Sequence, residues 1–285
     1  MRDPYHPVSL ALNCQDFFFE EFTKDIDIVM TGPNFIDTFQ NKDPYPIGLK
    51  STTHSAPWGT VCNATYGDCG CDNCEGNLSD LSSRMRRFKS YRRSLGRDRS
   101  LMIWGIPQSF WDDSYWTRSP TGQEYLTSCT IYVIEGAVGL MAWADGSMTP
   151  EQFDGTLDEA ATQFSGALKT MTPYLATPQL EIPEPTESNY VLARLWVSYD
   201  QKSVLVMTAN MKAEVGEWTI KIPESIGSIS LKSQNILFAS GVIDQPGFQN
   251  GQLFGKIEKI GCAAWVFDLD NVAVRTLLIH QDNTL

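Results

Sequence analysis

A change in the hydrophobic repeat near residue 175 divides the chain into two parts that belong to different fold classes. Before it, short continuous apolar runs alternate with amphipathic stretches of helical period. After it, apolar and polar residues alternate, as in strands with one buried face. Four prolines between Pro173 and Pro185 mark the boundary, because such proline density excludes a helix. The pattern predicts an α/β region over residues 1–175, a proline-rich linker over 176–189 and an all-β region over 190–285.

The first region is interpreted as four strand–helix units. Strands are expected at residues 6–13, 27–31, 101–106 and 139–144, and helices at residues 17–23, 78–95, 120–136 and 149–172. The strand expected at residues 101–106 is continuous in its hydrophobicity, as parallel strands buried on both faces are. Alternating strands and helices with short connections favour right-handed βαβ units and a parallel sheet.

The second region contains short runs of period two, separated by turn residues. The runs are VLARLWVSY, SVLVMTAN, EWTIKIP, SISLKS, GKIEKIG and CAAWVFDL. Runs of this length and spacing are typical of an antiparallel β-sandwich, here of about 95 residues.

Composition excludes several classes of function. Of the 285 residues 42% are hydrophobic, which is enough for a core, and the formal net charge is −12. An acidic chain does not track phosphates, so no nucleic-acid partner is expected. No apolar stretch is long enough to span a bilayer, so no membrane partner is expected. The three histidines lie far apart and there is no glycine-rich phosphate loop, so neither a metal nor a cofactor is expected.

Four of the seven cysteines crowd into a loop at residues 58–77. They are Cys62, Cys69, Cys71 and Cys74, and two N-x-S/T sequons, at Asn63 and Asn77, lie in the same loop. This combination predicts a disulfide-linked, glycosylated loop in an extracellular protein. A zinc site is the weaker alternative, because the spacing C-x₆-C-x-C-x₂-C fits no common zinc motif. Four cysteines allow three pairings, and the spacing does not choose among them.

The N-terminal sequence does not fit that extracellular location. Residues 1–7 hold one basic residue and no apolar segment, so they are no signal peptide. We therefore expect the chain to be the C-terminal part of a longer secreted protein. Residues 32–42 are either a genuine loop or sequence read through by an imperfect gene model, and we favour the second.

The first region contains, in this order, the motifs DPYHPVSLALNC, DIDIVMT with DPYPIG, GDCGCDNC, LMIWGIPQSF, YWTRSPTGQE and IYVIEGAVGLMAWA. On these motifs it resembles the closing half of a (β/α)₈-barrel glycoside hydrolase of the kind found among secreted fungal proteins. The resemblance implies a partial TIM barrel made of the last four βα units. It also implies that the β-sandwich is a C-terminal accessory domain.

The same resemblance places catalytic carboxylates at the ends of the fourth and seventh barrel strands. The fourth strand is not in this chain, and Gln108 stands roughly where the second carboxylate is expected. The resemblance therefore implies hydrolysis of O-glycosidic bonds by a full-length parent, with this chain alone inactive. The alternative is a non-catalytic carbohydrate-binding or structural relative that lacks the carboxylate pair. Either way the expected partner is an oligo- or polysaccharide. A half barrel is also expected to self-associate, because both outer strands of its sheet have open edges.

Candidate sugar-binding residues are those expected at the carboxyl ends of the strands, where barrel sites lie. They are Asn13, Asp43, Tyr45, Gln108, Trp111, Trp116 and Asp145. Other interpretations stay open: Asn13 as a helix cap, Asp43 and Tyr45 as a rigid turn, Asp145 as a turn or cap. Trp111 and Trp116 either stack on sugar rings or pack inside the protein. Gln108 is expected to line the pocket as a binder.

Other charged residues are expected to be structural. Glu124 and Glu135 fall within the expected helix 120–136, away from the barrel mouth. The basic residues between Arg84 and Arg93 are interpreted as an exposed helix face, solvated or paired with acidic groups.

Overall fold

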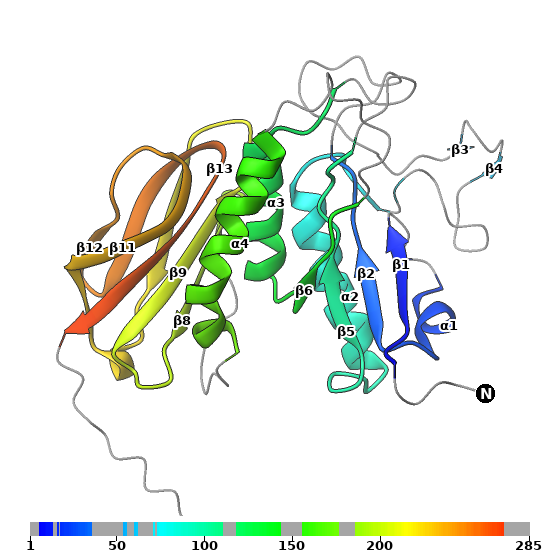
Figure 1. The fold of residues 1–285 in the computed structure, drawn as a ribbon, viewed down its shortest axis with the longest axis horizontal. Coiled ribbons are helices and arrows are strands. Elements are labelled where there is room, and N and C mark those ends of the chain that lie inside the picture. Colours follow the sequence, from blue (N-terminus) through cyan, green and yellow to red (C-terminus); the bar gives the residue numbers. More distant parts are fainter. Residues whose placement is uncertain are drawn as a thin grey trace, which may run out of the picture.

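The computed structural model describes residues 6–13, 16, 18–35, 54–55, 60–61, 71, 73–110, 118–143, 156–176 and 186–270. Within them, a four-stranded parallel sheet and a seven-stranded antiparallel sheet stand on either side of two helices, α3 and α4 (Figure 1). No helix among these residues is both long and apolar enough to cross a membrane.

The parallel sheet has the strand order β1-β2-β5-β6, so that each strand lies beside its predecessor in the α/β region. Its strands are β1 (Ser9–Asn13), β2 (Ile28–Thr31), β5 (Met102–Gly105) and β6 (Gly139–Leu140). The helices are α1 (Phe19–Thr23), α2 (Ser79–Ser94), α3 (Gly122–Ile134) and α4 (Thr156–Leu175). Two short strands, β3 (His54–Ser55) and β4 (Thr60–Val61), form a separate antiparallel pair. The expected alternation of strands and helices is confirmed. Helix α4 extends beyond the expected end at residue 172, because Pro173 lies in its last turn, where little of the helix remains to be broken.

Helices α2 and α3 cover one face of the parallel sheet. Val29 and Ile103 point to this face and join a core with Leu81 and Phe88 of α2 and with residues of α3. Alternate residues point to the opposite face, where Ile28, Met30 and Ile106 form a smaller apolar cluster. Both faces of the central strand β2 are therefore buried, which explains its continuous hydrophobicity.

Gly105 permits the close contact between β5 and α3. A Cβ atom at this position would lie 2.2 Å from Cγ of Tyr132, a fully buried residue of α3. We expect Gly105→Val to lower the free energy of unfolding by about 1–3 kcal/mol or more, since a well-packed core does not absorb extra methyl groups. Gly166→Ala in α4 is the control, because no atom lies within 4 Å of the added Cβ. Alanine in a helix should raise stability there by up to about 1 kcal/mol. Urea unfolding curves that coincide for the two variants would contradict this account.

The antiparallel strands form one continuous, curled sheet, in which the longest strand pairs with four others. Its strands are β7 (Thr186–Ser188), β8 (Val191–Val197), β9 (Ser203–Asn210), β10 (Gly216–Lys221), β11 (Ser228–Val242), β12 (Gly247–Gln249) and β13 (Gln252–Asp270), with a short 3₁₀ helix at Glu224–Ile226. Strand β13 pairs with β9 and β10 and also with β11 and β12. The curl brings β10 beside β7, where Thr186 Oγ1 donates to the carbonyl oxygen of Thr219 at 3.2 Å.

The predicted antiparallel strands are confirmed, but their layout differs from a sandwich of two separate sheets. GKIEKIG and CAAWVFDL were expected as separate strands, and both belong to β13, which runs through 19 residues. Ile260 adopts a left-handed backbone conformation (φ 53°) at the junction of the two runs. This local irregularity lets β13 bend, so that it pairs with β10 before Ile260 and with β9 after it.

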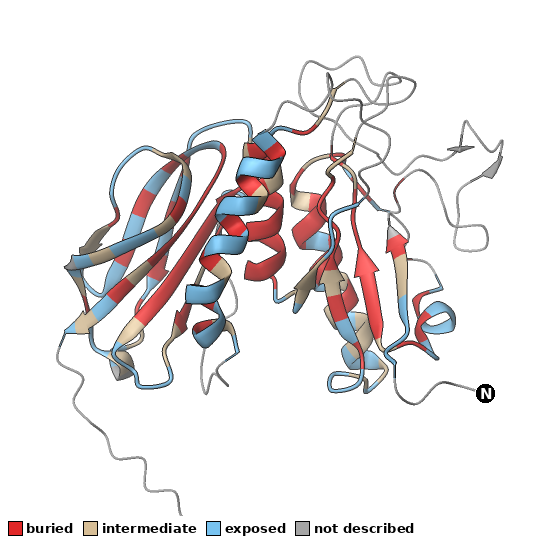
Figure 2. Cartoon of the chain, viewed as in Figure 1, coloured by how far each residue is buried: buried red, intermediate tan, exposed pale blue. Residues whose placement is uncertain are grey.

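Both faces of the antiparallel sheet are buried at β9 and at the second half of β13, whereas the outer face of β10 and of the first half of β13 is exposed. The inner face holds Trp218 and Trp265, whose stacked rings lie 5.6 Å apart between centroids. The outer face of β9 and β13 packs on α3 and α4, in the same core that covers the parallel sheet. Figure 2 shows α3 buried along almost its whole length, whereas α4 is exposed on its outer side. One core therefore extends across the two regions distinguished in the sequence.

Two free cysteines lie in this shared core, Cys129 on α3 and Cys262 on β13. Burial raises the pKa of the Cys262 thiol to about 11, and burial also raises the pKa of the Cys129 thiol above its usual range. Both side chains are therefore neutral thiols at physiological pH, and they act as small apolar packing residues.

Candidate functional site

The carboxyl edge of the parallel sheet continues beyond β5 and β6. Gln108 and Trp143 form a parallel bridge past the ends of these strands. The backbone N–H of Trp143 donates to the carbonyl oxygen of Pro107 at 3.2 Å, and Ser109 Oγ donates to the carbonyl oxygen of Trp143 at 2.6 Å. Ligands of open α/β sheets bind at this edge, so these residues form the first part of the candidate site.

The structure places two of the predicted sugar-binding residues at this edge. Gln108 is buried, with 1% of its surface exposed, and Asn13 is the last residue of β1. The other five predicted residues, Asp43, Tyr45, Trp111, Trp116 and Asp145, lie outside the described residues. Trp143 was not among the predicted site residues, yet its side chain is 38% exposed next to Gln108.

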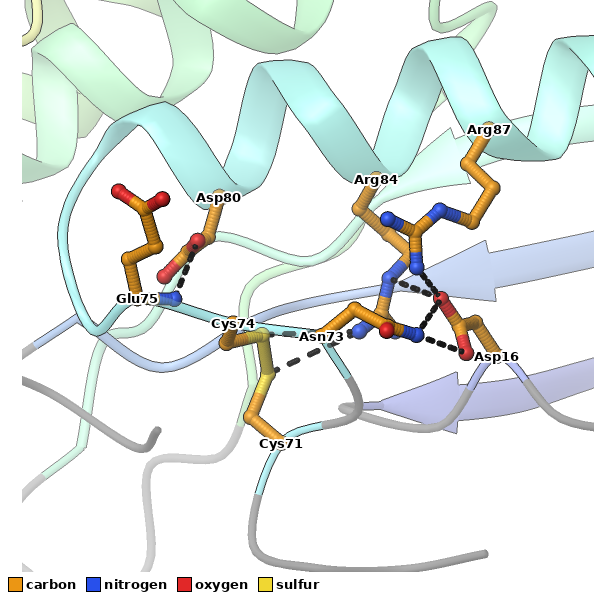
Figure 3. A network of polar contacts seen from close by, with 8 residues as sticks. All are labelled: Asp16, Cys71, Asn73, Cys74, Glu75, Asp80, Arg84 and Arg87. Atoms are coloured by element: carbon orange, nitrogen blue, oxygen red, sulfur yellow. Dashed lines mark hydrogen bonds and ion pairs between the residues drawn. A yellow bond between two sulfur atoms is a disulfide. The ribbon is translucent and has the colours of Figure 1, made fainter. Parts of the chain in front are cut away.

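A buried carboxylate, Asp16, lies between β1 and α1 along the chain, and its ion pairs connect this position to α2 (Figure 3). Arg84 Nε lies 3.8 Å from Asp16 Oδ2, with both side chains buried, and Arg87 forms a second ion pair with the same oxygen. Asn73 Nδ2 lies 3.1 Å from each carboxylate oxygen. The charge of Asp16 is therefore matched by two guanidinium groups and an amide, as a buried charge requires.

Arg84 also contacts a disulfide between Cys71 and Cys74. Its Nη2 atom lies 3.7 Å from Sγ of Cys71 and 3.6 Å from Sγ of Cys74. For this pair the predicted disulfide is present, and bonded sulfurs are not thiolate ligands for zinc. Cys62, Cys69 and the sequon residue Asn63 lie outside the described residues.

Asp80 fixes the segment between the disulfide and α2. Its carboxylate accepts hydrogen bonds from the backbone N–H groups of Glu75, Gly76 and Asn77, at 2.9, 2.6 and 3.0 Å. Burial raises the pKa of Asp80 above its usual value, while the three amide hydrogen bonds act in the opposite direction. Asn77 Oδ1 accepts the backbone N–H of Ser79 at 2.8 Å, and glycosylation of Asn77 stays a prediction. Residues 75–77 are therefore firmly attached to the first turn of α2.

These contacts limit the chemistry that the described part of the edge can perform. Asp16 is held by arginines and Asp80 by backbone amides, so neither carboxylate is positioned as a general acid or a nucleophile. The described residues contain no group of three or more histidine, cysteine or acidic side chains that fits a metal ion. What the edge does offer is an amide, Gln108, with both donor and acceptor atoms, and an indole ring beside it.

The Asp16–Arg84 pair is the part of the site that sequence reasoning missed. The prediction that this basic face is exposed is wrong for Arg84, which is 3% exposed, whereas the predicted pairing with an acidic group is present, with Asp16. A signal was present, because Arg84 follows Leu81 by three residues and precedes Phe88 by four, on the buried side of α2. Asp16, distant in sequence, had no comparable signal.

Glu124 and Glu135 are structural, as predicted. Glu124 forms a capping box with Thr121 at the start of α3, and its oxygens accept from Arg118 at 2.6 and 2.7 Å. Glu135 is fully buried at the end of α3, where it accepts from Ser82 Oγ at 2.6 Å and from Arg86 Nε at 2.8 Å. Glu135 thus connects α3 to α2.

Comparison with known proteins gives structural similarity without sequence similarity. No protein-family model matches the chain, and no curated protein sequence matches it. Among solved structures, an α-amylase from Anoxybacillus is 12% identical, with 88% of this chain and 54% of that chain covered and a TM-score of 0.44. α-Galactosidase I from Mortierella vinacea is 9% identical, with 91% and 57% covered and a TM-score of 0.45. A putative α-galactosidase from Bacteroides fragilis is 11% identical, with 92% and 47% covered and a TM-score of 0.43. This chain therefore spans about half the length of these similar glycoside hydrolases.

Proposed function

We propose that the chain binds carbohydrate at the carboxyl edge of its parallel sheet and is part of a glycoside hydrolase-like protein. Hydrolysis of O-glycosidic bonds belongs to a full-length protein with further βα units. The observation that carries the proposal is Gln108, a buried amide at the carboxyl end of β5, at the edge where parallel sheets bind ligands.

The chemistry of this edge suits a neutral sugar. The amide of Gln108 can donate to one hydroxyl group and accept from another. The exposed indole of Trp143 offers an apolar ring face next to it, which suits the C–H-rich face of a pyranose. Asn13, the last residue of β1, stays a proposed sugar-binding residue of the same edge.

A second candidate function is carbohydrate binding without catalysis in any form of the protein. The observation that favours it is that both described carboxylates near this edge, Asp16 and Asp80, are held in structural contacts. Gln108 cannot replace a carboxylate, since an amide neither attacks an anomeric carbon nor transfers a proton usefully.

An extracellular location is part of the proposal. It is supported by the disulfide between Cys71 and Cys74, since disulfides persist in oxidising compartments. Self-association through the outer strands β1 and β6 of the parallel sheet also stays a proposal, and sedimentation velocity over a range of concentrations tests it.

The binding proposal is tested by affinity electrophoresis in native gels containing soluble starch, dextran or mixed-linkage β-glucan. We expect retardation of the wild type on at least one polysaccharide and about tenfold weaker binding for Gln108→Ala, because a sugar hydroxyl loses a buried hydrogen-bonding partner. Gln163→Ala is the matched control, since Gln163 is an exposed residue of α4. Equal binding by Gln108→Ala and the wild type would contradict the proposal.

The same samples separate the two candidate functions. Release of reducing sugar from the bound polysaccharide by this chain would show that it holds a working carboxylate pair. We expect no release from this chain. Release by a longer form of the protein would then favour the hydrolase, and binding without release by that longer form would favour the non-catalytic relative.

A further inference from the structure

The antiparallel sheet carries a groove on its outer surface, away from the parallel sheet's carboxyl edge. It has a volume of about 290 Å³ and lies over β10, β12 and β13. All of its lining residues fall within the described part of the chain. The volume is at the lower end of the range for small-molecule sites, so the groove suits a ligand the size of a mono- or disaccharide.

An exposed aromatic ring forms the floor of this groove. Phe254, on β13, is 41% exposed. It pairs across the sheet with Thr219 on one side and Gly247 on the other. A Cβ atom at Gly247 would lie 2.6 Å from the Phe254 ring, so the ring lies directly over the glycine. The missing side chain at residue 247 thus lets the ring lie close against the neighbouring strand.

The floor itself is rigidly supported from below. Trp218, on the inner face, lies against Gly255, where an added Cβ atom would be 2.9 Å from the indole ring. Trp218 is 2% exposed and stacks on Trp265 in the inner core. A platform held in this way loses little conformational entropy when a ligand binds to it.

Charged side chains lie beside the Phe254 ring, on the same strand and on the neighbouring strand β10. Lys256 Nζ lies 2.9 Å from Glu217 Oε1, and both side chains are more than half exposed. Asp244 lines the same groove as this pair. The hydrogen bond to Glu217, together with the negative charges of Glu217 and Asp244, raises the pKa of Lys256 above its usual value. The groove therefore offers carboxylate acceptors and an ammonium donor next to an aromatic face.

From this arrangement we infer that the groove over β10, β12 and β13 is a saccharide-binding site, with Phe254 as its stacking platform. The ring suits the C–H face of a pyranose, and the charged side chains suit its hydroxyl groups. Two carboxylates against one ammonium group disfavour phosphorylated and other anionic ligands. The inference goes beyond the proposed function, which concerns the other sheet, and it uses only the chemistry of the groove.

The test uses the full chain in native gels containing soluble starch, dextran or mixed-linkage β-glucan. We expect Phe254→Ala to weaken binding of the retained polysaccharide by at least about tenfold, as loss of an anchoring aromatic does. Phe254→Trp keeps a ring and should stay within about threefold of the wild type, and Asp244→Asn should weaken binding less than Phe254→Ala. Tyr199→Ala is the matched control, because Tyr199 is 87% exposed in the turn between β8 and β9.

Each outcome decides the inference. Unchanged binding by Phe254→Ala overturns it, as does the absence of retardation of the wild type on all three polysaccharides. Weaker binding for Gln108→Ala with unchanged binding for Phe254→Ala leaves the proposed function standing and removes the groove. The reverse result keeps the groove and removes the edge of the parallel sheet as a binding site. Circular dichroism spectra of the variants, matched to the wild type, exclude misfolding as the cause of any loss.

Discussion

Replacing Trp265 with alanine is expected to lower the free energy of unfolding by about 3–5 kcal/mol, enough to unfold many proteins of this size. Trp265 is 1% exposed and stacks on Trp218 inside the curled sheet. It lies on β13, opposite Val206 of β9 and Ile236 of β11, so the cavity would open where three strands meet. Urea denaturation followed by far-UV circular dichroism measures the loss.

Trp265→Phe separates packing from hydrogen bonding at the same position. The indole N–H of Trp265 is buried and has no hydrogen-bonding partner among the described residues, so its removal breaks no bond. The smaller ring should keep most of the contacts and cost less than half as much as alanine. If the two substitutions cost the same, the stacked pair is not what holds the sheet together.

Asp16→Ala is expected to have an effect of similar size in the α/β region, about 3–5 kcal/mol, through a different mechanism. The substitution leaves Arg84 buried without the carboxylate that balances its charge. It also removes the acceptor for Asn73 and Arg87, so the loop next to the disulfide loses its attachment to β1. Thermal and urea unfolding both measure the change.

Two further variants identify the buried charge as the cause. Asp98→Ala removes the partner of Arg92 in a partly exposed pair and should cost about 1 kcal/mol or less. The double variant Asp16→Ala with Arg84→Met removes the unbalanced charge and should recover part of the loss. A double variant less stable than Asp16→Ala would mean that Arg84 stabilises the protein mainly through its contacts with the disulfide and with Phe88.

Helices and strands were predictable where the pattern of buried residues lies within the element itself. Helix α2 was expected over residues 78–95 and is found at Ser79–Ser94, because its apolar residues recur with the helical period. Strand β2 was expected from five consecutive residues and has both faces covered. The curl of the second sheet was not predictable in the same way, because it depends on β13 continuing through the irregular backbone at Ile260.

The candidate site was only partly predictable for a related reason. Gln108 was predictable because it comes just after an apolar strand in the sequence, and the structure places it at the carboxyl edge of the sheet. Arg84 was misjudged, because its burial depends on Asp16, in a loop after a different strand. Charge runs on a helix are usually solvated, and only the tertiary contact shows which of the arginines is not. Trp143 was expected only as part of the strand at residues 139–144, and the bridge to Gln108 shows that it lies at the edge.

The burial of α3 between two sheets has a consequence for synthesis of the protein in the cell. Eleven of the thirteen residues of α3 are buried, and much of what covers them is β13 and β9. Ile134 ends α3, and Gln252, the first residue of β13, is 118 residues further along the chain. At roughly 5–20 residues per second, the ribosome takes about 6–24 s to make that segment. During this interval the apolar surface of α3 is exposed, so the nascent chain is a natural client for chaperones that shield hydrophobic helices.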